Sequence, residues 1–143
     1  MKYECTYNHN MNTIEVSARG PADLKTSIEM TYRIAEICGQ EKSANVLIDF
    51  LELDTSFITM GHIAALSRTA VSLQDALKMR KCAYVVARNL EFGFVRPWKT
   101  MISTNGFVDL EIRAFKNKGK AIEWVKAGAP NQECTSSAIA GQR

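Results

Sequence analysis

The chain has 143 residues, of which 46% are hydrophobic and 23% charged, a composition typical of one soluble globular domain. Its apolar runs are shorter than the roughly 20 residues of a transmembrane helix, and its first residues lack the apolar core of a signal peptide, so we expect a cytoplasmic protein. The net charge is +3, but residues 1–75 carry 6 basic and 10 acidic side chains, whereas residues 76–143 carry 12 basic and 5 acidic ones. The basic residues of the second half are dispersed, which disfavours nucleic-acid binding.

The first half of the chain predicts two paired strands, a helix and a buried strand. Residues 2–18 alternate apolar and polar side chains around an asparagine-rich turn, as in a β-hairpin with one buried face. A helix should follow from Pro21 to Gly39, because proline suits a first helical position and glycine a helix end. Residues 45–50 are apolar on both faces except at Asp49, which indicates a strand in the middle of a parallel sheet.

The next segments predict a helix over 58–79 and a strand over 82–87, from a core-facing apolar stripe followed by a β-branched run. Asp54, Thr55 and Ser56 precede this helix, and each has a side-chain oxygen that can cap a helix N-terminus. The alternation of strands and helices indicates an α/β domain, in which ligands usually bind at loop ends.

A third helix is predicted between residues 89 and 102, and it is apolar around much of its circumference. Gly93 and Pro97 lie inside it, and an interior proline removes a backbone hydrogen bond and clashes with the preceding turn. We therefore expect either a kink or two short helices, with Pro97 starting the second. A half-exposed strand over 108–114, a short helix capped by Asn117 and a flexible tail over 128–143 complete the chain.

Three segments carry a resemblance to a known family. They are the apolar strand 46–49 that ends in aspartate, the segment 89–96 with its glycine and arginine, and the closing Ala-x-x-Trp-hydrophobic helix at 121–125. In this order, over residues 3–127, the chain resembles the SpoIIAA-like family, a branch of the STAS fold that is related in shape to CRAL-TRIO lipid carriers. The predicted elements follow the order β-β-α-β-α-β-α-β-α, and the resemblance implies that they form one α/β domain over 1–127 with a mixed sheet.

The same resemblance implies a regulatory role without catalysis, often as a homodimer. In the anti-sigma-factor antagonists of this fold, a partner kinase phosphorylates a serine at the start of the helix after the aspartate strand. Asp54-Thr55-Ser56 resembles their Asp-Ser-Ser/Thr-Gly, although Phe57 stands where that motif has glycine. Thr55 and Ser56 are thus either phosphorylation sites or simple helix caps, and both interpretations stay open.

The helix around residues 90–102 is a second candidate site. As a mobile lid over an apolar cavity, it would carry cavity-lining side chains and Arg96, which could meet an anionic head group. The alternatives are core packing and a dimer interface, where aromatic residues and methionine are also enriched. The cavity-lining candidates are Phe92, Phe94, Trp98 and Met101.

No pattern in the sequence predicts a catalytic or metal site. The four cysteines stand far apart, neither histidine has metal-ligand spacing, and phosphate-loop patterns are absent. We expect Asp49 and Asp54 to position loops by hydrogen bonding, and no cofactor to be required. Together with the composition, the resemblance implies a non-catalytic cytoplasmic interaction module that forms a homodimer and binds a regulatory protein or kinase. The alternative is a carrier of a small apolar or lipid-like ligand.

Overall fold

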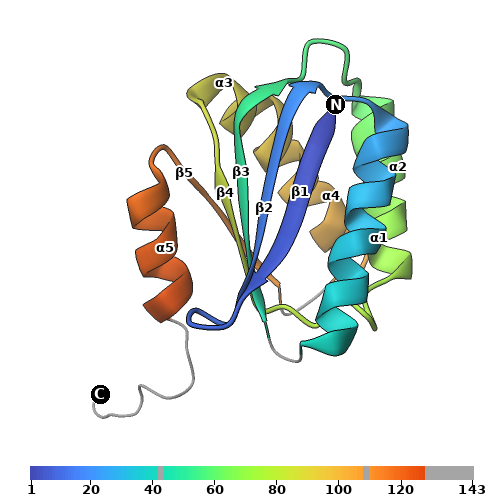
Figure 1. The fold of residues 1–143 in the computed structure, drawn as a ribbon. Helices are drawn as coiled ribbons and strands as arrows, with labels where there is room; N and C mark the ends of the chain where they lie inside the picture. The colour runs from blue at the N-terminus through green and yellow to red at the C-terminus, as the bar shows by residue number, and fades with distance from the viewer. Residues whose placement is uncertain (42–43, 108–109, 128–143) are drawn as a thin grey trace.

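The computed structural model describes residues 1–41, 44–107 and 110–127, so the predicted tail lies outside the described residues. Strands and helices follow one another in the predicted order, with the third helix divided into consecutive pieces (Figure 1). The elements are β1 (Lys2–Asn8), β2 (Thr13–Pro21), α1 (Leu24–Gln40), β3 (Asn45–Asp54), α2 (Met60–Ser72), β4 (Lys81–Val85), α3 (Arg88–Leu90), the π-helical segment η1 (Glu91–Val95), α4 (Arg96–Thr104), β5 (Glu111–Phe115) and α5 (Lys118–Ala127).

The five strands form one mixed sheet in the order β1-β2-β3-β4-β5. β1 and β2 are antiparallel, as the hairpin pattern predicts, and every other neighbouring pair is parallel. β3 lies at the centre, which confirms the prediction from its two-sided apolar run. None of the helices in the described part of the chain is long and apolar enough to span a bilayer.

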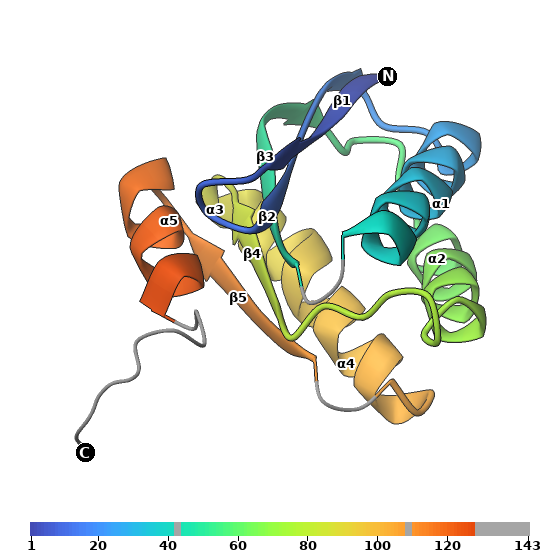
Figure 2. The same cartoon turned by 60° about the horizontal axis from the view of Figure 1, so that its bottom comes forward.

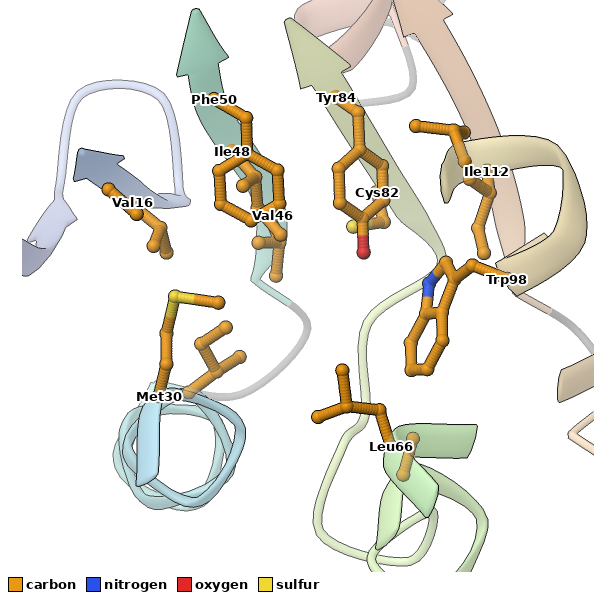
Figure 3. Close-up of a cluster of buried hydrophobic side chains, with 14 of the residues drawn as sticks. Val16, Met30, Val46, Ile48, Phe50, Leu66, Cys82, Tyr84, Trp98 and Ile112 are labelled. Carbon is orange, nitrogen blue, oxygen red and sulfur yellow. The ribbon is translucent and has the colours of Figure 1, made fainter. Parts of the chain in front are cut away.

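Helices cover the two faces of the sheet unequally (Figure 2). α1, α2 and α4 pack on one face, where alternate strand residues such as Ile48 and Tyr84 join the main core (Figure 3). α5 lies on the other face, where Leu47 and Val85 join a smaller core with Val125. Alternate residues of one strand point to opposite faces, so β3 supplies both cores.

The starts of α1 and α2 differ from the predictions. Pro21 is the last residue of β2, and Asp23 caps α1 by accepting a hydrogen bond from the backbone N–H of Thr26 at 2.7 Å. The cap of α2 is Thr59, whose side chain and backbone exchange hydrogen bonds with His62. The predicted caps fail because β3 continues to Asp54, where it pairs with β2.

The irregularity predicted near Pro97 takes the form of a π-helical segment, and the second helical piece, α4, begins at Arg96 rather than at Pro97. Pro97 occupies the first turn of α4, immediately after the five residues of η1. Proline has no N–H to donate to a preceding carbonyl, and a widened π-turn accommodates the missing bond without ending the helix. Gly93 lies inside η1 with open space around its Cα, so a side chain there would meet no neighbour. The strand predicted over 108–114 begins later, at Glu111, and residues 108–109 are not described.

A buried amide connects α5 to the amino-terminal ends of β3 and β4. The Asn45 side chain accepts a hydrogen bond from the backbone N–H of Lys81 at 3.0 Å and donates one to the carbonyl of Val125 at 3.5 Å. The Lys81 ammonium donates to the carbonyl of Trp124 at 2.9 Å and lies 4.7 Å from the centre of its ring. The hydrogen bonds of Asn45 and Lys81 thus help to hold α5 on the sheet, where the core beneath the helix is the smaller of the two.

We expect Asn45→Ala to lower the free energy of unfolding by about 1–3 kcal/mol, because the partly buried N–H of Lys81 would lose its acceptor. Urea denaturation measures this change. Asn10→Ala, in the exposed turn between β1 and β2, is the control and should change stability by less than about 0.5 kcal/mol. Equal effects of the two substitutions would contradict the role assigned to Asn45.

Candidate functional site

The carboxyl ends of the parallel strands β3 and β4 meet at the upper edge of the sheet in Figure 1. The chain leaves β3 through residues 55–59 to reach α2, and it leaves β4 through residues 86–87 to reach α3. Ligands and partners of α/β domains commonly bind at this edge, because loop side chains and helix N-termini converge there. Both candidate segments from the sequence, 54–56 and 89–102, begin at this edge.

The loop after β3 presents polar and apolar side chains together. The Asp54 carboxylate accepts one hydrogen bond from the Ser56 hydroxyl and another, at 2.9 Å, from the Ser56 backbone N–H. These two bonds hold the pKa of the Asp54 carboxyl below its ordinary value. Phe57 is 72% exposed and Met60 is 54% exposed. The loop is therefore held by its own polar contacts, and Phe57 and Met60 face solvent whereas Ile58 packs against the main core.

Thr55 and Ser56 do not cap α2, so the capping interpretation is wrong for both residues. Ser56 is exposed next to Asp54, and Thr55 contributes to the wall of a cavity beneath the loop. A phosphate on Ser56 would lie beside a carboxylate rather than on the first turn of a helix. Its charge would then repel Asp54 instead of being stabilised by the helix dipole.

The aromatic residues predicted as a cavity lining divide into two groups. Phe94 stacks on Trp98 with ring centroids 6.2 Å apart, and it meets the edges of Phe50 and Tyr84. Phe92 points away from this cluster and is 47% exposed.

The outward-facing group joins Phe92 to two guanidinium groups. Arg96 lies over the Phe92 ring at 4.2 Å, and Arg88 lies over the same ring at 5.6 Å. Met101 packs against the main core and lines neither of the cavities described below. Only Phe94 and Trp98 of the predicted set therefore reach the space beneath the helix.

Tyr84 is the buried polar residue of the cluster, and the sequence analysis did not select it. The Trp98 indole N–H is directed towards the Tyr84 hydroxyl, with Cys82 alongside (Figure 3). Burial raises the pKa of the tyrosine well above its ordinary value, and its contact with Cys82 adds to this effect. Burial also raises the pKa of the Cys82 thiol to about 12. Both groups are neutral and unreactive at physiological pH.

Two small apolar cavities lie between the sheet and its helices. Their volumes are about 40 and 60 Å³, whereas pockets for small-molecule ligands measure roughly 300–1,000 Å³. Tyr84 and Trp98 line both cavities, together with Met30 and Thr31 of α1. These α1 residues were also missed, because only the packing of α1 against the sheet brings them to the cluster.

Asp49 lies on the sheet face that carries α5, where it pairs with Val85 at the end of β4. Its carboxylate accepts a hydrogen bond from the backbone N–H of Leu51 at 3.0 Å, so the bond is made within β3 rather than to a loop. Among the described residues, no group of three or more histidine, cysteine, aspartate or glutamate side chains is arranged to hold a metal ion. The site is thus a surface of loop and helix side chains above a filled core.

A family model described as SpoIIAA-like matches residues 13–126. The match begins at the first residue of β2 and ends within α5, so it covers the parallel part of the sheet and every helix. A comparison with curated proteins gave no match.

We expect Tyr84 to make the protein less stable in alkali. Above pH 10.0, the ordinary tyrosine pKa, the unfolded chain loses this proton while the folded protein keeps it. The free energy of unfolding should then fall by about 1.4 kcal/mol per pH unit from this group. Urea denaturation at about pH 9 and about pH 11 should show a shallower fall for Tyr84→Phe. Tyr32→Phe, at an exposed tyrosine, is the control. If the free energy of unfolding of Tyr84→Phe fell with pH as steeply as that of the unmodified protein, the role assigned to Tyr84 would be contradicted.

Proposed function

Because the chain belongs to the SpoIIAA-like family, we propose that it is a non-catalytic regulatory module that binds a partner protein through residues 55–60. The observation that carries this proposal is the exposure of Phe57 and Met60 beside the Ser56 hydroxyl. Aromatic residues and methionine are enriched at protein interfaces, and exposed apolar residues at a loop commonly mark a contact surface. The filled core below the loop also favours a surface role over a ligand cavity.

Phosphorylation of Ser56 by a partner kinase would regulate this contact. The unmodified hydroxyl donates a hydrogen bond to Asp54, and this bond helps to fold the loop. A phosphate would replace the donor with about two negative charges next to the carboxylate, which breaks the turn by repulsion. Phe57 is the next residue, so the same event would change how its ring is presented. Thr55 is the less favourable acceptor, because it is half-buried against the cavity.

We expect Phe57→Ser with Met60→Ser to reduce partner binding by about tenfold or more, since central apolar side chains dominate interface energies. Both side chains are exposed, so the free energy of unfolding should change by less than about 0.5 kcal/mol for each substitution. The measurement is quantitative mass spectrometry of proteins crosslinked to the tagged chain in its own cells. Tyr32→Ser, which is 54% exposed on α1, is the matched control. Crosslinks that survive in the loop variant and decrease in the control would refute the proposed surface.

Carriage of a small apolar ligand is a second candidate, favoured by one observation. The two cavities share the walls formed by Met30, Thr31, Tyr84 and Trp98. A shift of the Trp98 side chain would therefore join them beneath η1, where the π-turn has already altered the regular helix ladder. The joined cavity would still have to expand before it could admit a lipid-sized molecule.

Native mass spectrometry of the detergent-free protein distinguishes the two functions. A ligand carrier should retain an apolar molecule that is lost on denaturation, and Trp98→Ala should change its retention. An interaction module should show no such molecule. A mass increase of one phosphate that disappears in Ser56→Ala would support the regulatory proposal, whereas a retained ligand without phosphate would favour the carrier.

A further inference from the structure

The face of the sheet that carries α5 is only partly covered. α5 packs on β3, β4 and β5 through Ala121 and Val125, and in the described part of the chain no helix lies over β1 or β2 on that side (Figures 1 and 2). The uncovered part, which we call the outer groove, has two adjoining hollows of about 210 and 200 Å³. The polar residues lining the outer groove are Glu4, Thr6, Glu15, Ser17, Arg19, Asp49, Glu52 and Lys118.

The outer groove has the width of one helix. Neighbouring strands lie about 4.8 Å apart, so β1 and β2 together present a strip about 10 Å wide, which is the diameter of an α-helix with its side chains. α5 forms one wall of the groove through Lys118. A second helix of similar length could therefore lie beside α5 and complete the layer. Leu51, which is 48% exposed at this face, would gain apolar cover.

The charges of the outer groove and of α5 are complementary. Four carboxylates line the groove, against the two basic residues Arg19 and Lys118. The solvent-facing side of α5 carries Lys120 and Lys126, with Glu123 as its acidic exception. This arrangement gives a structural meaning to the division of charge along the chain, because the acidic half supplies the groove and the basic half supplies the helix.

We propose that the outer groove binds α5 of a second copy of this chain, in a two-fold symmetric dimer. A two-fold axis between the copies lets each α5 lie against the outer groove of the other, so one chain supplies both halves of the contact and the contact forms twice. The two α5 helices would then lie side by side between two sheets. Residues 55–60 are outside this surface, so the dimer is independent of the proposed partner contact.

Charge exchange between variants tests the proposal. Glu4→Lys with Glu15→Lys makes the groove basic, and Lys120→Glu with Lys126→Glu makes α5 acidic. Each double variant alone would oppose like charges in both contacts, so we expect its dimer to dissociate at concentrations about tenfold or more above those of the unmodified protein. An equimolar mixture of the two variants restores opposite charges in both contacts and should form a mixed dimer. Sedimentation velocity over a range of protein and salt concentrations measures each species.

Two matched variants control for net charge. Glu29→Lys with Asp75→Lys and Lys25→Glu with Lys99→Glu alter exposed residues away from the outer groove and should leave the dimer unchanged. Phe57→Ser with Met60→Ser should also leave it unchanged, which separates this inference from the proposed function. Urea denaturation shows whether each variant folds. If only one of the two charge-reversed variants folds, the loss of its dimer alone tests the proposal. A monomeric unmodified protein, a dimer indifferent to the charge reversals, or a mixture that stays monomeric would each overturn the proposal.

Discussion

The burial of β3 on both faces is the constraint on which the rest of the structure depends. Ile48 faces the main core and Leu47 faces the smaller one, so this strand is stable only with helices on both sides of the sheet. Its parallel neighbours require crossover connections, and these supply α1, α2 and the helix after β4 on one face. The other face receives only α5 among the described elements, which explains why β1 and β2 remain open to solvent there.

The main core favours a surface function because it is nearly full. Pro97 forces a widened turn just before α4, and the aromatic rings of Phe94 and Trp98 occupy the space beneath it. Tyr84 satisfies its buried hydroxyl within this cluster, so the polar atom needs no ligand. The remaining cavities are far smaller than a lipid. The side chains proposed to contact a partner therefore lie on the surface, in the loop after β3 and in the outer groove.

These two surfaces differ in their physical character. The loop offers Phe57 and Met60, whose contact area suits hydrophobic binding and whose neighbour Ser56 can carry a charge switch. The outer groove is polar, and complementary charge there would mainly determine specificity and the rate of association. The two proposed contacts use separate surfaces, so the proposed self-association and the proposed partner binding would not exclude each other.

The sequence by itself determined the order of elements, the hairpin, the central position of β3 and the irregular helix near Pro97. These follow from residue periodicity and from the missing proline N–H, which are local properties. The tertiary structure alone decided that Thr59 rather than Ser56 caps α2, since pairing with β2 extends β3 to Asp54. It also decided which of the aromatic residues in 90–102 face the core, and that acidic strands lie beside a basic helix. Such features arise from contacts between residues distant in the chain, and no local pattern encodes them.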